Sequence, residues 1–303
     1  MILDQTRDRA MTAPRLSIIS ACMAAGLLLV GCGSMGGGTE VPSAPPPPTS
    51  PQERSRGAGL YRDGIRALNP SRGGVPDPGR AAILIEAAAA LGDPDAQLMV
   101  GSSHLFRPDG GRDAAAAIPW LHRSAQQGTA EAQFRLGQLI EAGDGTSREP
   151  AWAAVWFQRA AERGHPEAHF AMALLQVAGE GTAQDDAEAL ARLRISERRG
   201  VAAARRYREA LQRRVPAVAA RHAESRLAGE TSRGPVPPVD RPIARFAQSG
   251  LATQGLWTAP VNGRDGPQTR AALTAFARRE GIPAAMPYDP AIITRLRERL
   301  RPG

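Results

Sequence analysis

Apolar residues follow three different patterns along the chain. Between residues 16 and 30 they form an almost uninterrupted run. Between residues 57 and 228 they lie in short segments closed by glycine, and between residues 241 and 303 they recur on three segments at helical spacing. Glycine commonly ends helices, and a three- to four-residue spacing places apolar side chains on one helical face. The pattern therefore predicts an all-α protein, with a helical array followed by a small three-helix domain.

The apolar run near the N-terminus predicts a secretory signal over residues 1–31. Arginines precede the run, and it ends at Leu29-Val30-Gly31-Cys32. It is shorter than the roughly 20 residues that a transmembrane helix needs. A buried core helix is the alternative interpretation. Met11 is an alternative start, since Arg15 would still place a positive charge ahead of the run.

The end of this run resembles the lipobox of bacterial lipoproteins. The resemblance implies cleavage before Cys32, lipidation of that cysteine and a lipid anchor in a membrane. Gly33 stands where an Asp would signal retention in the inner membrane, so the resemblance implies a periplasmic protein anchored to the outer membrane. The second cysteine, Cys22, would be removed with the signal, which leaves no intramolecular disulfide.

Two stretches of biased composition divide the rest of the chain. Residues 32–56 are rich in Gly, Ser and Pro, which predicts a tether, and residues 229–240 are again rich in Pro, which predicts a linker. The predicted folded regions are therefore 57–228 and 241–303. The second region is near the lower size limit for a domain that folds alone.

The central region contains an internal repeat with a period of 36 residues. Gly92, Gly128, Gly164 and Gly200 keep this interval, and so do Ala96, Ala132, Ala168 and Ala204. Trp120 and Trp156 are in register as well. Each unit is predicted to contain two helices. The glycines are predicted to end helices in the left-handed conformation, and Asp185 to cap the helix that follows it.

Residues 81–204 resemble Sel1-like repeats. The matching pattern is Ala-Ala-x-x-Gly-x-x-x-Ala after a Trp, followed by Gly-x-Gly and an acidic residue. The resemblance implies a right-handed α-solenoid, related to tetratricopeptide arrays, whose concave face binds peptides or protein partners. We expect one or more envelope proteins as these partners. About four units are expected from near Gly57 onward. Arg192 replaces the Trp of the last unit, which is expected to be a cap.

The C-terminal region predicts three helices from its apolar faces. These faces comprise Ile243, Phe246 and Ala247, then Leu273, Phe276 and Ala277, and finally Ile292, Ile293, Leu296 and Leu300. Pro267 and Pro290 are placed where a first helical turn tolerates proline, and Asp289 is expected to cap the last helix.

Residues 255–276 resemble the peptidoglycan-binding-like domain of cell-wall proteins, through a Pro-Val-Asn-Gly loop followed by Gly-Pro-Gln-Thr-Arg at the start of a helix that carries a Phe. The resemblance implies peptidoglycan binding by Asn262, Arg264, Asp265, Thr269 and Arg270. Asn262 stands in for the family's Asp. The arginines and the helix N-terminus would suit the carboxylates of wall-peptide stems. The alternative is that these residues only shape the loop.

The charge and the candidate catalytic residues point away from enzymes and from nucleic acid. The net charge is +8, but the basic residues are all Arg and are spread along helices beside acidic residues. His165 and His169 share a helical face without a third metal ligand, and Asp185, Asp186 and Glu188 are better explained as a helix start. We therefore expect no enzymatic activity, no cofactor, no metal and no nucleic-acid partner.

Two functions remain from the sequence. The first is an envelope lipoprotein scaffold that binds peptidoglycan with its C-terminal domain and protein partners with its repeats. The second is an accessory lipoprotein of a secretion or polysaccharide-export complex, whose C-terminal domain is only structural.

Overall fold

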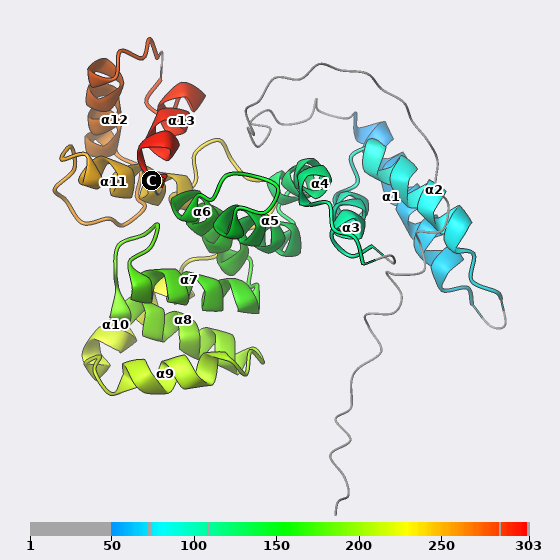
Figure 1. Cartoon of the computed structure of the whole chain (residues 1–303), viewed down its shortest axis with the longest axis horizontal. Coiled ribbons are helices and arrows are strands. Elements are labelled where there is room, and N and C mark those ends of the chain that lie inside the picture. The colour runs from blue at the N-terminus through cyan, green and yellow to red at the C-terminus, as the bar shows by residue number, and fades with distance from the viewer. Residues whose placement is uncertain (1–49, 72–73, 108–109, 285, 302–303) are drawn as a thin grey trace, which may run out of the picture.

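The computed structural model describes residues 50–71, 74–107, 110–284 and 286–301. Every regular element in these ranges is an α-helix, so the predicted fold class is confirmed. The helices are α1 (Pro51–Leu68), α2 (Pro78–Ala90), α3 (Pro94–Leu105), α4 (Ala114–Gln126), α5 (Ala130–Ala142), α6 (Pro150–Glu162), α7 (Pro166–Ala178), α8 (Asp186–Arg198), α9 (Ala204–Gln212), α10 (Ala217–Ala228), α11 (Arg241–Thr253), α12 (Pro267–Arg279) and α13 (Pro290–Arg299) (Figure 1). The predicted signal and Cys32 lie outside the described residues.

The first eight helices form four consecutive hairpins. Helix α1 packs on α2, α3 on α4, α5 on α6 and α7 on α8, and each hairpin stacks on the next. Helices α9 and α10 both pack on α8 and end the array. Figure 1 shows the resulting solenoid, with α1 and α2 at one end and α9 and α10 at the other.

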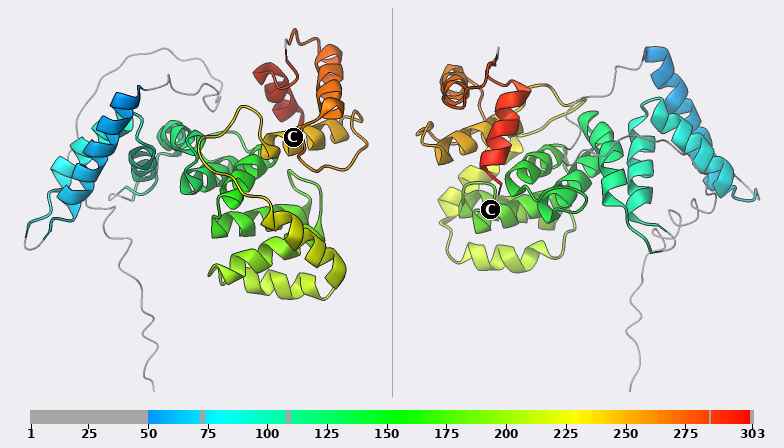
Figure 2. Two further views of the ribbon diagram at one scale, coloured as in Figure 1. Left: turned by 180° about the vertical axis from the view of Figure 1, so that it is seen from behind. Right: turned by 45° about the horizontal axis from the view of Figure 1, so that its top comes forward.

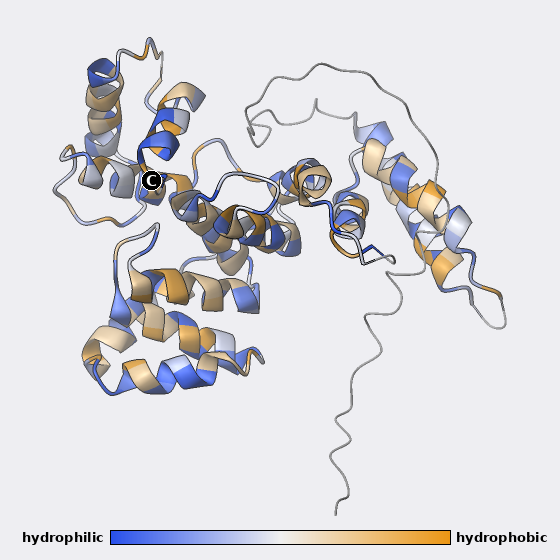
Figure 3. Ribbon diagram, viewed as in Figure 1, coloured by the Kyte–Doolittle hydropathy of each residue, from blue (hydrophilic) through white to orange (hydrophobic). Residues whose placement is uncertain are grey.

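Small residues at the repeat positions allow the helices to approach closely. The repeated alanines Ala96, Ala132, Ala168 and Ala204 are all 0% exposed. A Cβ on Gly137 would lie 2.7 Å from the ring of Phe157, so only glycine leaves room for that ring. Trp156 is fully buried, whereas its counterpart Trp120 is half-buried at the edge of the core. Figure 3 shows that hydrophobic and hydrophilic residues alternate along the helices of the array.

The repeated glycines adopt the left-handed conformation that the sequence predicts. Their φ angles are +88° at Gly92, +97° at Gly128, +87° at Gly164 and +99° at Gly200. Each follows the C-terminal end of a helix, where a residue with a Cβ would be strained. Asp185 also caps α8 as predicted, because its Oδ1 accepts a hydrogen bond of 2.8 Å from the amide of Glu188.

Helix α1 begins within the stretch that the sequence assigns to the tether. It starts at Pro51, whereas the tether was predicted to extend to residue 56. Ser50 and Glu53 form a capping box, in which each side chain accepts a hydrogen bond from the other's backbone amide. The tether prediction is therefore wrong over residues 51–56, because the proline-rich composition masked this helix start.

The predicted linker, residues 229–240, is packed against the solenoid instead of hanging free (Figure 2). The amide of Ser232 donates to the carbonyl of Glu162 at 3.0 Å, and the amide of Val236 donates to the carbonyl of Gln126 at 2.7 Å. These carbonyls belong to the last turns of α6 and α4, where helices leave acceptors unsatisfied. We call residues 229–240 the strap, because they connect the C-terminal ends of two repeats.

The C-terminal unit, α11 to α13, is a three-helix unit that shares its hydrophobic core with α6. Ala151 and Val155 of α6 are buried in the same cluster as Phe246, Leu273 and Phe276. The sequence-based expectation of a separate small domain is thus incomplete, since part of the unit's core comes from the solenoid. Within the described part of the chain, no helix combines the length and apolarity needed to cross a membrane.

Candidate functional site

The five residues predicted to bind peptidoglycan lie on the loop between α11 and α12 and on the first turn of α12. Gln248 of α11 organises this loop from inside. Its Oε1 accepts from the amides of Asn262 (3.0 Å) and Gly263 (2.9 Å). Its Nε2 donates to the carbonyl of Arg264 at 3.0 Å and to the hydroxyl of Thr269 at 3.1 Å. Gln248 could not be found from the sequence, because a single polar residue on an amphipathic helix belongs to no motif.

Gly263 brings this loop into contact with the start of α11. Its φ is +70°, and a Cβ there would lie 2.5 Å from Cγ of Arg241 and 2.9 Å from the carbonyl oxygen of Arg241. Only glycine fits this position, both for its conformation and for its close approach to another backbone.

Arg270, predicted to hold a ligand carboxylate, already holds a carboxylate of its own chain. Its guanidinium contacts Asp265 at 2.5 Å, and the hydroxyl of Tyr288 donates to the same carboxylate at 3.1 Å. The hydrogen bond from Arg270 lowers the pKa of Asp265, and burial raises the pKa of Tyr288. This triad closes the loop against the segment that precedes α13.

Two of the five predicted residues are therefore turned to solvent and available to a ligand. Asn262 and Arg264 are exposed, and the amide of Arg264 donates to Oδ1 of Asn262 at 2.8 Å, which fixes a local turn. Thr269 is 1% exposed and serves the loop from inside. Asp265 and Arg270 are engaged with each other.

A cavity of about 590 Å³ lies between this loop and the solenoid. Its lining combines the loop with α8, α10, the strap and α11: Glu188, Arg226, Gly229, Glu230, Arg241, Arg245, Val261, Asn262, Gly263 and Arg264. Four arginines face two glutamates in this lining, so the cavity is positively charged. We call it the loop cavity. The sequence alone predicts the loop but not the wall that the repeats contribute.

The wall of the loop cavity contains a buried ion-pair network centred on Glu188. Arg192, which is 1% exposed, contacts Glu188 at 2.7 Å, and Arg245 of α11 contacts it at 2.9 Å. Burial alone would favour the neutral acid, but the two guanidinium groups outweigh it and hold the pKa of Glu188 well below its usual range. Arg192 stands at the position of the repeated Trp, so this departure from the repeat supplies a charge where the C-terminal unit docks.

Three more ion pairs join the C-terminal unit to α6 and to Glu149, the residue that precedes α6. Glu149 is 4% exposed and accepts from Arg297 at 2.8 Å and from Arg301 at 2.9 Å. Arg159 donates to Asp240, the residue that caps α11, at 2.7 Å. The guanidinium of Arg297 also lies 4.6 Å from the centre of the Trp152 ring. Charged groups at these positions fix one orientation of the unit on the array.

His165 and His169, which the sequence places on one helical face, make two different kinds of contact. His165 caps α7 by accepting from the amide of Ala168, and its Nε2 lies 2.8 Å from Glu131. His169 is buried and donates to the carbonyl of Ala161. The described residues contain no cluster of three or more His, Cys, Asp and Glu side chains that could hold a metal ion.

The geometry defines the class of the molecule as an α-solenoid of helix hairpins, and the comparisons name the repeat. The family described as Sel1 repeat matches residues 57–93, 94–129, 130–165 and 166–191. The chain therefore contains four Sel1 repeats, which confirms the predicted repeat type. Repeats of this kind generally mediate contacts between proteins.

Several solved structures are similar to the chain, among them the following two. One is a protective antigen of uropathogenic Escherichia coli that displays an SLR fold, with 20% identity and a TM-score of 0.48 over 61% of this chain and 43% of that one. The other is a Sel1 repeat protein from Oxalobacter formigenes, with 27% identity and a TM-score of 0.40 over 43% of this chain and 98% of that one. The chain thus spans less than half the length of the E. coli antigen. Among curated proteins, no sequence matches the chain significantly.

Proposed function

We propose that this protein is a non-enzymatic envelope lipoprotein, anchored through Cys32 to the outer membrane and facing the periplasm. In this proposal the loop cavity binds peptidoglycan, and the Sel1 repeats bind one or more envelope proteins. The observation that carries the wall-binding part is the convergence of Asn262 and Arg264 with Arg226 of the solenoid and with Arg241 and Arg245 of α11 around one cavity of about 590 Å³. A volume of this order is typical of ligand sites.

The charge of the loop cavity favours an acidic polymer. Stem peptides of peptidoglycan carry carboxylates, and guanidinium groups bind carboxylates with short, charge-assisted hydrogen bonds. Arg264 is exposed and its side chain pairs with no other described residue, so it is available for such a contact. Arg226 is half exposed on the opposite side of the cavity.

The test is retention of the full chain on purified sacculi. Arg264→Gln is expected to weaken retention several-fold, and added salt is expected to weaken the unchanged protein in the same way. Arg278→Gln is the matched control, because Arg278 is exposed on α12 and lies outside the lining of the cavity. Equal retention of the two variants would refute the proposal that the loop cavity binds peptidoglycan.

The anchor has a separate test. Cys32→Ser removes the thiol that lipid transfer modifies, so we expect the variant to leave the membrane fraction or to accumulate unprocessed. A variant that is still processed and still sediments with membranes would refute the lipoprotein proposal.

An accessory role in a secretion or polysaccharide-export complex is the second candidate. The buried ion pairs that fix the C-terminal unit on α6 favour it, because a unit held in this way can simply stabilise the array. No retention of the full chain on sacculi above that of an unrelated control protein would favour this candidate.

A further inference from the structure

Helix α9 keeps the register of the repeats, but one of its faces has no helix packed on it. Ala204 and Leu211 of α9 are buried, like Ala168 and Leu175 at the equivalent positions of α7. Helix α9 therefore lies in the array as α3, α5 and α7 do. Each of those three helices is covered by the helix that follows it, whereas α10 packs on α8 and leaves α9 at the edge of the molecule (Figure 1).

In the earlier repeats, the following helix covers the same face each time. A Cβ on Gly137 of α5 would lie 2.7 Å from the ring of Phe157 in α6. Gln176 of α7 is buried, and its Nε2 donates to Glu188 of α8 at 2.7 Å. The face at these positions is thus one that receives a helix.

On α9 the equivalent positions are Glu209 and Gln212, and both are exposed. Arg205, Arg206 and Arg213 lie beside them, because helical residues three, four or seven apart share a face. These three arginines are exposed as well. We call the five residues the open face.

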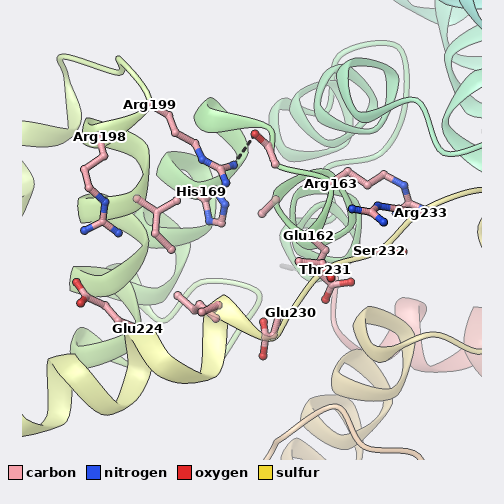
Figure 4. Close-up of a pocket in the computed structure, with 15 residues that line it drawn as sticks. Glu162, Arg163, His169, Arg198, Arg199, Glu224, Glu230, Thr231, Ser232 and Arg233 are labelled. Carbon is pink, nitrogen blue, oxygen red and sulfur yellow. Dashed lines mark hydrogen bonds between the residues drawn. The ribbon is translucent and has the colours of Figure 1, made fainter.

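The open face lies in a strongly basic part of the chain. Residues 198–222 contain eight arginines and one acidic residue, whereas residues 1–197 contain 18 arginines and 22 acidic residues. Positive charge is therefore concentrated at this end of the array. Arg198 and Arg199 are not part of the open face, because they line a cavity beside the turn between α6 and α7 (Figure 4).

Two arginines of the open face are available to a partner. Arg205 pairs with Glu209 at 3.0 Å, whereas the side chains of Arg206 and Arg213 make no hydrogen bond or ion pair with any residue that the structure describes. A polar outer face is enough to end a repeat array, and charges of mixed sign achieve this. Unpaired charges of one sign also attract an acidic partner.

The composition of the open face favours a protein over a lipid surface. Binding to a membrane surface relies on exposed large apolar residues in addition to basic ones. The open face contains no such residue. The aromatic residue of α9, Tyr207, packs edge-on against Phe170 of α7 instead, with 5.5 Å between the ring centres.

We infer that the open face binds an acidic α-helix of a partner protein, which takes the place of the next helix of the array. Carboxylates of the partner helix pair with Arg206 and Arg213 through charge-assisted hydrogen bonds. A second copy of this face is a poor partner, because it carries the same positive charge. The inference specifies one of the protein contacts proposed for the repeats and rests on that part of the proposed function.

The inference is tested with three peptide probes, titrated calorimetrically into the full chain. The first probe has the sequence of α8, the helix that covers α7, with the changes Arg192→Glu, Arg194→Glu and Arg198→Glu. The second probe has amides in place of all the carboxylates of the first, and the third adds Ala191→Pro, which breaks a helix.

We expect the first probe to bind, the second to bind about tenfold more weakly and the third to bind several-fold more weakly. Equal binding of the first and second probes would overturn the role of charge. Equal binding of the first and third probes would overturn the helix, and no binding of the first probe would overturn the inference as a whole.

Variants of exposed arginines locate the contact. The double variant Arg206→Gln, Arg213→Gln is expected to weaken binding of the first probe several-fold. The matched control, Arg80→Gln with Arg278→Gln, removes two exposed arginines from α2 and α12. Equal losses in the two double variants would overturn the assignment to the open face.

Glu209→Gln tests the inference in the opposite direction. The substitution removes the only acidic side chain of the open face and releases Arg205. We therefore expect the first probe to bind several-fold more tightly. Unchanged or weaker binding would contradict a contact between the probe and this face.

Two further measurements separate the open face from a membrane site and from the loop cavity. Cosedimentation with vesicles of phosphatidylcholine and phosphatidylglycerol, lost in the Arg206→Gln, Arg213→Gln variant while the first probe fails to bind, would assign the face to lipid and overturn the inference. Arg264→Gln is expected to weaken retention on sacculi but to leave binding of the first probe unchanged. Loss of probe binding with Arg264→Gln would place the probe in the loop cavity and overturn the inference without affecting the proposal for the wall.

Discussion

The hairpin α5–α6 and the hairpin before it, α3–α4, have the same fold, but residues at equivalent positions make different contacts. Asp113 caps α4 by accepting from the amide of Ala116 at 2.9 Å, and Asp77 and Asp185, each at a multiple of 36 residues from it, also cap helices. Glu149 occupies this position before α6 and makes no such cap. Its longer side chain instead accepts from Arg297 of the C-terminal unit.

The same contrast recurs one turn further along these helices. Ala116 of α4, Trp152 of α6 and Glu188 of α8 occupy one repeat position, and only the last two contact the C-terminal unit. Trp152 stacks edge-on against Phe246 with 5.4 Å between ring centres. At these two positions the residues that break the period contact the docked unit. The rule is not general, because Arg159 contacts Asp240 although it keeps the period set by Arg123.

The substitution with the largest expected effect on the docking of the C-terminal unit is Glu188→Gln. The substitution would leave Arg192 and Arg245 buried without their carboxylate, and breaking a buried ion pair costs about 3–5 kcal/mol. We expect a loss of this size in urea unfolding followed by circular dichroism. Trypsin should also cleave faster in the strap, because Arg245 fastens α11 to α8.

The control for this experiment is Glu209→Gln. Glu209 pairs with Arg205 on the surface of α9, where ion pairs add little to stability. An unfolding curve unchanged by Glu188→Gln, as we expect for the control, would show that the buried network does not hold the unit.

The sequence predicts the array better than it predicts the contacts between distant parts. The repeated glycines and alanines report local geometry and neighbouring helices, so their period indicates the hairpins directly. The docking of α11 on α6 depends on pairs such as Arg159 and Asp240, which are 81 residues apart. A single sequence contains nothing that links two such residues. The replacement of the repeated Trp by Arg192 is a visible departure near the docking contacts.

The candidate site was predictable to the same extent. The loop that contains Asn262 and Arg264 was found from its motif, and Pro267 begins α12 as expected. The internal support from Gln248 and the wall formed by Arg226 were not predictable, because both depend on how separate helices pack. The motif also could not show that Arg270 is already paired with Asp265.

An exchange between equivalent positions sharpens the comparison of the two hairpins. Glu149→Asp gives α6 the capping residue of its neighbours but shortens the side chain that reaches Arg297. We expect a loss of about 2–3 kcal/mol, because Arg297 is left buried without its partner. Asp113→Glu, the reverse change, should cost only the cap of α4, about 1 kcal/mol. Equal losses in urea unfolding would mean that Glu149 has no special role in docking.

Two buried histidines make the stability of the array depend on pH. Burial and the nearby Arg159 and Arg297 lower the pKa of His122 to about 4, and burial and Arg192 lower that of His169 to about 3. Both histidines take up a proton near pH 6.5 only when the chain unfolds, so the unfolded state gains stability as the pH falls below 6.5. By pH 5 each histidine should cost about 2 kcal/mol.

Glutamine variants test this pH dependence, since Gln158 and Gln133 occupy the equivalent positions in other repeats. The double variant His122→Gln, His169→Gln should unfold in urea with nearly the same stability at pH 7 and pH 5. This range lies above the pH at which Glu188 begins to lose its stabilising charge, because its unfolded-state pKa is about 4.5. If the double variant loses as much stability between pH 7 and pH 5 as the unchanged protein does, the pH dependence belongs to other groups.

The smallest expected effect separates two glycines of the same repeat position. Gly128 and Gly200 have φ angles of +97° and +99°, so alanine at either position carries a similar backbone strain of about 1–2 kcal/mol. A Cβ on Gly200 would meet no atom within 4 Å, whereas a Cβ on Gly128 would lie 2.2 Å from the carbonyl oxygen of Gly234 in the strap. Gly128→Ala should therefore displace the strap and cost about 1 kcal/mol more than Gly200→Ala in urea unfolding, in the range of ordinary overpacking. It should also speed tryptic cleavage at Arg233, which Gly200→Ala should leave unchanged. Equal losses and equal cleavage rates would mean that the strap does not rest on this repeat in solution, and that the period alone explains Gly128.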